Sequence, residues 1–432
     1  MKLRHVAVLS ISAAFLATCV WIMGGDAWAA RREGRSEFAW TAAFGRLEDL
    51  KRKYPKIETN ETAKRLEELA KALGFDLAPV VRTAGAAPRP RPPAEERTAQ
   101  TTSDYISAQI CRSEASIDAP PEELTRFLEE KRGTLEGIES LVIAGPPPMW
   151  SFDISRPERD APVPNGLGQL RLQRILLARA LSAALGGRGD AAARSLEASW
   201  NLNESLRTRP ETLSLLFAMA IARLQVGILR EVSVDERLWR QRLTTLDPRR
   251  SLLDAHVLDA RLNSSRNWWR DFFRNDGHSP WYKRARDLLA SPMERVVMVE
   301  YSNLMRDELS RLRGSALSDP LPEPPTPARG SAAQIIASIW MPYIRNSFAR
   351  VDRLVVDVEL TSKILEAKQL RKENGMRWPA AIPGIETSRF PGASWRYEAT
   401  PDGRMSIAFS RELASPYAQT GMKPLPLRFS SN

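Results

Sequence analysis

Apolar residues recur at helical spacing along most of the chain and predict a mainly α fold, a multi-helix array of helical hairpins. In the middle of the chain Leu177, Leu181 and Leu185 mark one face of a helix. The glycine-rich stretch 186–189 ends that helix, and Leu196 begins the apolar face of the next. The expected result is a hairpin of two neighbouring helices.

A different pattern follows Pro210, where residues 213–229 are apolar on almost every face of a helix. A helix that is apolar all round needs neighbours on most of its faces. We therefore expect this helix at the centre of the fold.

Residues 331–374 predict a long helix near the C-terminus. Its apolar positions alternate at steps of four and three, which is the seam of a helix packed along one side. The seam comprises Ile344, Phe348, Val351, Val355 and Val358. We expect it to be buried against the central helices. The residues predicted to be exposed on the other face are Arg345, Arg353 and Lys363.

After this helix the chain predicts a small C-terminal β hairpin. Gly375 can end the helix in the left-handed conformation, and Pro379 prevents the helix from resuming. Beyond them, alternating residues flank a turn at 401–403, which is the pattern of two paired strands. The alternating residues are Trp395, Tyr397, Met405, Ile407 and Phe409.

Two proline-rich stretches and an N-terminal apolar run divide the chain into six predicted parts. These are a signal peptide or signal anchor at 1–30, short N-terminal helices at 31–82, a linker at 83–102, a central helical domain at 103–313, a second linker at 314–330, and a unit of long helix and small β structure at 331–432.

The first thirty residues have the pattern of an export signal. Lys2 and Arg4 precede an uncharged run at 6–23, and Ala27 and Ala29 form the A-x-A pattern that precedes a cleavage site. Eighteen apolar residues are also just enough to span a bilayer, so an uncleaved single-pass inner-membrane anchor is the second interpretation. We favour cleavage over anchoring, and expect the chain in the cell envelope, on the periplasmic side.

Two further features of this segment bear on its processing. Arg31, Arg32 and Arg35 follow the run, so basic residues lie on both sides of it and the orientation of an anchor stays open. The stretch Leu-Ala-Thr-Cys that ends at Cys19 resembles a lipoprotein box, but Thr18 fits poorly before the cysteine.

Arginine dominates the charge of the chain. Of the 63 basic residues 51 are arginines, and the formal net charge is +11. Guanidinium groups pair with carboxylates in a planar fork, and 52 acidic residues are available for this. The excess also permits an acidic partner, such as anionic lipid headgroups or a wall polymer. Export makes nucleic acid an unexpected partner.

Histidine and cysteine are too scarce for most catalytic or metal-binding arrangements. The chain has three histidines and two cysteines, and no spacing among them fits a zinc site, a Ser-His-Asp triad or a Cys-His pair. We therefore expect no metal and no cofactor.

Carboxylates are the remaining candidates for catalysis. Asp352 and Glu359 share a helix face at a spacing of seven, and so do Glu300 and Asp307. Two carboxylates held at different pKa values can perform acid-base chemistry in a cleft. In an arginine-rich helical chain such residues more often form ion pairs, so a cofactor-free envelope hydrolase is an alternative and not the first choice.

Aromatic residues and arginines gather between two predicted helices and form a candidate interaction surface. They are Trp268, Trp269, Arg270, Phe272, Phe273, Arg274, Trp281 and Tyr282. Aromatic rings beside arginines can stack on a sugar or lie at a lipid headgroup layer. The competing interpretation is ordinary packing of a helix end in the core.

Several segments resemble a family of bacterial exported or membrane-anchored helical proteins of uncharacterised function. The segments are 54–74, 164–170, 196–211 and 374–410. The resemblance implies an envelope location and brings no catalytic residues. The long helix, the Gly-x-x-Trp-Pro turn and the small sheet also resemble the C-terminal end of type II secretion pseudopilins.

The sequence as a whole predicts a non-catalytic interaction or scaffolding protein of the cell envelope, with an unknown envelope protein or an anionic surface as its partner. If the N-terminal segment is uncleaved, it would also hold the chain in the membrane. Two alternatives stay open, the cofactor-free hydrolase and a module that binds a polyanion or anionic lipid.

Overall fold

Helices make up most of the part of the chain that the structure describes, and a small antiparallel sheet follows them, which confirms the predicted fold class. The structure is a computed structural model and describes residues 2–80, 93–154, 163–265, 281–318, 321, 332–417 and 423–431. The chain forms two units. The first consists of Met1–Lys53, His256–Ser315 and Glu323–Arg345, and the second of Tyr54–Ala255, Ala316–Pro322 and Asn346–Asn432.

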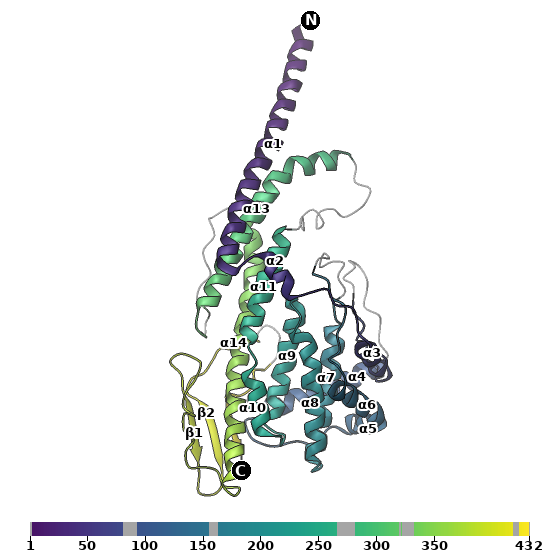
Figure 1. Ribbon diagram of the computed structural model, residues 1–432, viewed down its shortest axis with the longest axis vertical. Helices are drawn as coiled ribbons and strands as arrows, with labels where there is room; N and C mark the ends of the chain where they lie inside the picture. The colour runs from purple at the N-terminus through teal and green to yellow at the C-terminus, as the bar shows by residue number, and fades with distance from the viewer. Residues whose placement is uncertain are drawn as a thin grey trace. The chain divides into compact units, whose positions relative to one another are not determined.

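The first unit is built around two helices that lie side by side, α1 (Lys2–Phe44) and α13 (Trp281–Gly314) (Figure 1). Gly45 ends α1 in the left-handed conformation that favours glycine, and the short helix α2 (Leu47–Lys53) follows. The last part of α11 (Pro248–Ser265) and the first part of α14 (Ala332–Glu373) complete this unit.

The second unit contains a body of packed helices. They are α3 (Glu61–Ala72), α4 (Pro93–Ile110), α5 (Glu122–Glu130), α6 (Arg132–Ala144), α7 (Gly166–Leu185), α8 (Gly189–Arg207), α9 (Thr212–Leu229) and α10 (Glu236–Thr244). Helices α7, α8 and α9 pack against one another in sequence order, as the predicted hairpins require. Asn60 and Asn165 cap α3 and α7 with side-chain oxygens that accept backbone N–H bonds.

Helix α9 lies at the centre of this body, as its uniformly apolar sequence predicts. Among the described residues, it is the helix whose length and composition would let it cross a membrane. However, 72% of its residues are buried inside the protein. Its apolar character is therefore accounted for by the core.

The C-terminal sheet has three antiparallel strands in the order β1-β2-β3. The predicted hairpin is confirmed as β1 (Trp395–Ala399) and β2 (Met405–Phe409), with Trp395 opposite Phe409 and Gly403 left-handed in the turn. The third strand, β3 (Arg428–Ser431), was not predicted.

Helix α14 confirms the predicted long helix, and Gly375 follows its end in the left-handed conformation. Two separate clusters of apolar side chains pack on it. Leu354, Val358 and Leu365 belong to the core of the helical body. Val356, Leu360, Ile364 and Ala367 belong to a second core with the sheet.

Because α14 is covered on two sides, the predicted polar face is wrong. Four of the five seam residues are buried, and Val355 is half-buried. Arg353 and Lys363 are only 6% and 8% exposed, and Arg345 is half-buried beside Glu308, 3.3 Å away. A spacing rule for one seam cannot reveal the second partner.

The predicted extent of the first linker also needs correction. The linker predicted at 83–102 is helical from Pro93, which occupies the first position of α4, where proline is tolerated. Asp235 caps α10 with a side-chain oxygen that accepts the Leu238 backbone N–H. Pro292 lies inside α13, whose first turns bend away from α1 (Figure 1).

The sheet-facing side of α14 gives a direct test of its packing. Leu360 is fully buried, so Leu360→Ala should lower the free energy of unfolding by about 2–5 kcal/mol. The same change at Leu185, which is 49% exposed, is the matched control and should cost less than about 0.5 kcal/mol. Urea unfolding of both variants measures the difference, and equal midpoints would contradict the two-sided packing.

Candidate functional site

The C-terminal half of α1 is docked on α13 by side chains that meet in register. The Trp40 indole N–H donates to the Ser302 hydroxyl at 2.8 Å, and the Ser36 hydroxyl donates to the Asn303 amide oxygen at 2.9 Å. Trp40 is almost fully buried. Arg295 binds Glu33, and Arg313 donates to the Ala43 carbonyl oxygen. Contacts over this longer span advance together along both sequences, so the two helices run parallel.

Arg295 of α13 holds the middle of α1. Its guanidinium makes a two-point contact with the Glu33 carboxylate at 2.8 and 2.6 Å, and a third bond with Asp26 at 3.0 Å. These bonds, first those to Glu33, raise the pKa of Arg295. Ala29 lies between the two carboxylates in sequence and is fully buried. The stretch 26–33 is therefore part of the folded unit.

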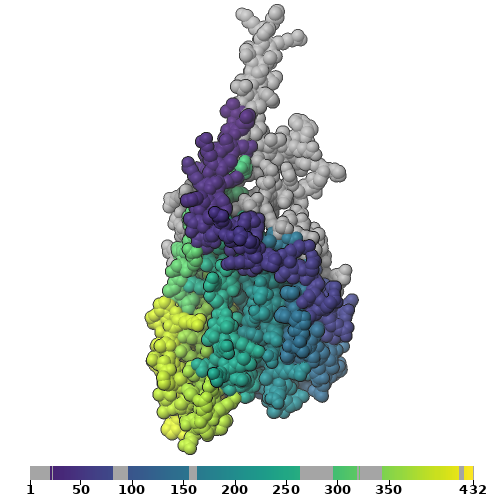
Figure 2. Space-filling model, viewed as in Figure 1, coloured from purple at the N-terminus to yellow at the C-terminus, as the bar shows by residue number. Residues whose placement is uncertain are grey.

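The part of α1 that precedes this contact carries exposed apolar side chains. Val20 is 64% exposed and Met23 74% exposed, and the Trp21 and Trp28 rings are also exposed. Arg32 lies over the Trp28 ring at 4.6 Å. In Figure 1 the N-terminal half of α1 continues past α13, and Figure 2 shows the coloured residues of α1 at the surface. This half of α1 is the candidate interaction site of the first unit.

In the second unit, charged side chains are buried between α9 and α14. Asp357 is fully buried and forms ion pairs with Arg353 at 3.5 Å and Arg230 at 3.7 Å. The Arg230 Nε–H donates to the Thr361 hydroxyl at 2.9 Å, and its Nη1 donates to the Pro426 carbonyl oxygen at 2.9 Å. The centre therefore joins two helices to the segment that precedes β3.

Burial shifts the pKa of both members of the central pair toward neutrality. It raises the pKa of Asp357, against the opposing effect of Arg353 and Arg230. It lowers the pKa of Arg230 to about 10. Arg230 thus stays charged at neutral pH, and its partners stabilise that charge.

Two more arginines hold the same C-terminal segment. Arg353 donates to the Leu425 carbonyl oxygen, and Arg223 donates to that of Lys423. Arg223 also lies over the Tyr417 ring at 5.1 Å. At this point Arg223 and Arg353 therefore bind backbone carbonyl groups of the same chain.

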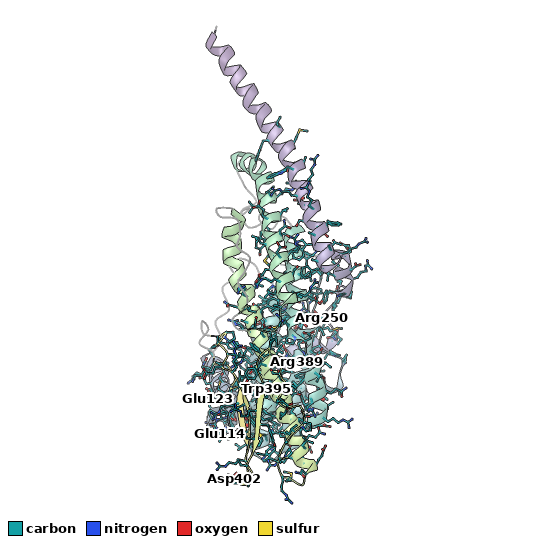
Figure 3. The ribbon with its side chains drawn as sticks, turned by 90° about the vertical axis from the view of Figure 1, so that its left-hand side faces the viewer. Glu114, Glu123, Arg250, Arg389, Trp395 and Asp402 are labelled. Carbon is teal, nitrogen blue, oxygen red and sulfur yellow. The ribbon has the colours of Figure 1, made fainter. Side chains whose placement is uncertain are left out.

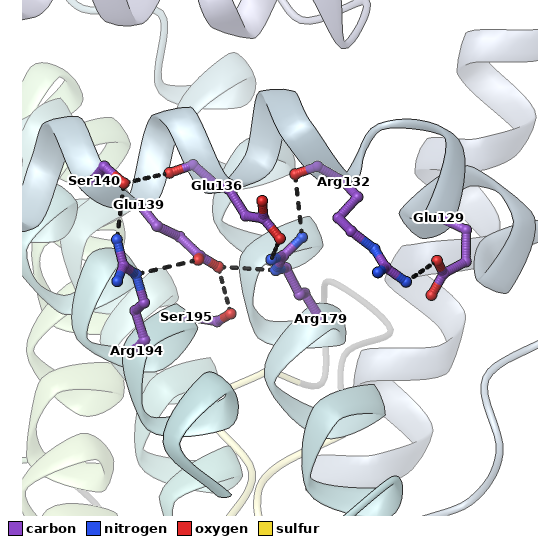
Figure 4. Close-up of polar contacts among 8 residues, drawn as sticks. All are labelled: Glu129, Arg132, Glu136, Glu139, Ser140, Arg179, Arg194 and Ser195. Atoms are coloured by element: carbon purple, nitrogen blue, oxygen red, sulfur yellow. Dashed lines mark hydrogen bonds and ion pairs between the residues drawn. The ribbon is translucent and has the colours of Figure 1, made fainter. Parts of the chain in front are cut away.

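A second buried carboxylate ties α6 to α7 and α8 (Figure 4). Glu139 accepts a hydrogen bond from Ser195 at 2.5 Å and pairs with Arg179 at 3.0 Å and with Arg194 at 3.7 Å. Three partners from two other helices surround this carboxylate. This arrangement is structural.

Glu231 and Lys368 interact electrostatically, and burial moves the pKa of each toward neutrality. Burial raises the pKa of Glu231 to about 7 and lowers that of Lys368 to about 8. Glu231 accepts the Ser116 backbone N–H at 3.0 Å, and Lys368 donates to the Arg230 carbonyl oxygen at 2.6 Å. Because these residues lie far apart in the sequence, no spacing pattern could have paired them.

The structure places the predicted carboxylate pairs in ion pairs and hydrogen bonds. Asp352 lies 3.2 Å from Arg249. Glu359 accepts hydrogen bonds from the Trp395 indole at 2.9 Å and the Arg389 backbone at 3.2 Å. Figure 3 labels Trp395 and Arg389, which lie close together. The other pair separates in the same way. Glu300 pairs with Arg32 at 3.2 Å, and Asp307 with Arg306 at 2.7 Å.

The predicted aromatic–arginine surface falls largely on residues that the structure does not describe. Residues 268–274 lie outside the described ranges. Trp281 and Tyr282 form the first turn of α13, where only the backbone is described. The candidate surface therefore stays a prediction.

Little in the described part of the chain suggests metal chemistry. Among those residues, no group of three or more histidine, cysteine, aspartate or glutamate side chains could hold a metal ion. His256 is buried, and burial lowers its pKa to about 4, so that it is neutral at neutral pH.

Comparison with known proteins gives no further identification. No protein-family model, no curated protein and no solved structure matches the chain. The resemblances drawn from the sequence therefore stay predictions.

The buried centre predicts a large effect of a small substitution. Asp357→Asn leaves Arg230 and Arg353 without their carboxylate and should lower the free energy of unfolding by about 3–5 kcal/mol. Asp402→Asn is the matched control, because Asp402 is exposed and asparagine keeps an oxygen that can accept the Thr400 hydroxyl. Its urea midpoint should not change. A similar midpoint for both variants would show that the pair contributes little.

Asp352 predicts a defined pH dependence. Burial raises its pKa from 3.8 to about 6, so the folded state binds the proton more tightly than the unfolded state. The resulting stabilisation is complete below pH 3.8 and is lost as the pH rises through about 6. The free energy of unfolding of the wild type, relative to Asp352→Asn, should fall by about 1.4 kcal/mol per pH unit in this window. A difference that is independent of pH would contradict the shift.

Proposed function

We propose that this chain is a non-catalytic interaction or scaffolding protein of the cell envelope. The observation that carries the proposal is the two-part character of α1. Its C-terminal half is docked on α13 by Trp40 and Arg295, while the half before it carries Val20 and Met23 exposed. An apolar helix end joined to a folded body suits a protein that is held at a membrane and presents the body to a partner.

The charged residues support a structural and not a catalytic role. The carboxylates that the sequence singled out for hydrolysis, Asp352 and Glu359, are engaged by Arg249 and Trp395. The buried Asp357 holds two arginines that bind the C-terminal segment. These are the contacts of residues that maintain a fold, so the hydrolase alternative is not favoured.

An anionic membrane surface is a compatible second partner. Arg31 and Arg35 are exposed on α1 just beyond its apolar run. Basic residues beside a membrane segment are attracted to anionic headgroups by about 1 kcal/mol each. This contact would assist the location of the protein and does not require a separate binding pocket.

The outer edge of β1 is the place where a protein partner could bind through its backbone. Within the described residues, the sheet order leaves β1 at one edge. The Thr400 N–H bonds across the hairpin to the Arg404 carbonyl oxygen at 2.8 Å, so the amides of Tyr397 and Ala399 face outward by alternation. An extended segment of a partner can add to such an edge.

In-cell photo-crosslinking tests this function. A crosslinking residue at the exposed position Arg396 should capture a discrete partner, whereas one at Glu123, exposed on the helical body, should not. Ala399→Pro removes an outward N–H and should abolish the adduct while leaving the thermal unfolding midpoint nearly unchanged.

A reporter fused after Asn432 should be active only when exported. Activity confined to the cytoplasm, or no adduct from an exported chain, would overturn the proposal.

A further inference from the structure

Helix α1 runs without interruption from the apolar segment into the folded unit. It covers 43 residues, and its apolar run at 6–23 occupies the N-terminal part. Eighteen helical residues extend about 27 Å, close to the roughly 30 Å hydrocarbon thickness of a bilayer. The apolar run and the half docked on α13 are thus two parts of one continuous helix.

The predicted cleavage site lies in the docked half. Cleavage after Ala29 would cut α1 in the middle of its helix, directly after a residue that is fully buried. Removal of residues 1–29 would also delete Asp26 and leave Arg295 with Glu33 as its remaining carboxylate on α1.

The residues at the end of the run are suited to the boundary of a bilayer. Val20, Trp21 and Met23 are exposed at the end of the run, and the exposed ring of Trp28 follows five residues later. Tryptophan is enriched where hydrocarbon meets headgroups, and arginine beyond it favours the aqueous side. Arg31 and Arg35 hold that position here.

We propose that residues 6–23 are retained on the mature protein as a helix that spans a lipid bilayer, while residues 26–44 of the same helix dock it on α13. This inference rests on the proposed envelope location and names the membrane as the occupant of the exposed half of α1. The contacts of Asp26, Ala29 and Glu33 then belong to the mature fold, and the small residues at 27 and 29 serve helix packing instead of cleavage.

Intact mass and membrane extraction of the full chain, expressed in a Gram-negative bacterium, test the inference. Retention predicts the mass of the whole chain, 48.5 kDa, in membranes that resist extraction with alkaline carbonate. A chain shortened by 29 residues in the soluble envelope fraction would overturn the inference and leave the proposed function standing. So would an acylated chain that begins at Cys19. A full-length chain that is soluble in the cytoplasm would overturn both.

Two substitutions on α1 distinguish a helix that spans the bilayer from one that only adsorbs to the membrane surface. Leu16→Arg places a charge in the middle of the run, so the carbonate-resistant fraction should fall severalfold. Phe38→Arg is the matched control, because Phe38 is 78% exposed on the same helix but beyond the run. It should leave that fraction unchanged. An equal effect of both substitutions, or none from Leu16→Arg, would show that residues 6–23 do not span the bilayer.

Discussion

The burial of charge between α9 and α14 is the constraint on which the second unit depends. A guanidinium and a carboxylate removed from water are costly unless each finds the other and the remaining donors are satisfied. Arg230 meets this condition only when Asp357, Thr361 and the Pro426 carbonyl group are all in place. Apolar packing alone would tolerate small shifts of α14 along α9, whereas this set of partners specifies one position.

The helices were predictable because their apolar periodicity is local. The second face of α14 was not, because a one-sided seam and a helix covered on both sides share the positions Phe348, Val351 and Val358. Strand β3 gave no signal, since a strand of four residues without a tight turn to its neighbour resembles a loop. The burial of Arg353 depends on a carbonyl group at Leu425, 72 residues further along the chain.

The candidate site shows the same limit of sequence reasoning. The apolar run of α1 is evident from composition, but the meaning of the alanines that follow it is not. A small residue satisfies a peptidase that cleaves after it, and it also lets two helices approach closely. The burial of Ala29 and the contacts of Arg295, on a helix more than two hundred residues away, support the role in helix packing. Neither can be read from the residues near the alanines.

The buried arginine also constrains the order of events during synthesis. Arg230 leaves the ribosome well before its partners, since Asp357, Thr361 and Pro426 follow it by 127, 131 and 196 residues. At about 5–20 residues per second the last of them arrives roughly 10–40 s later. During this interval Arg230 lacks its buried partners, so the contact between α9 and α14 cannot reach its final packing. The native packing of α9 against α14 is therefore completed only when translation is nearly finished.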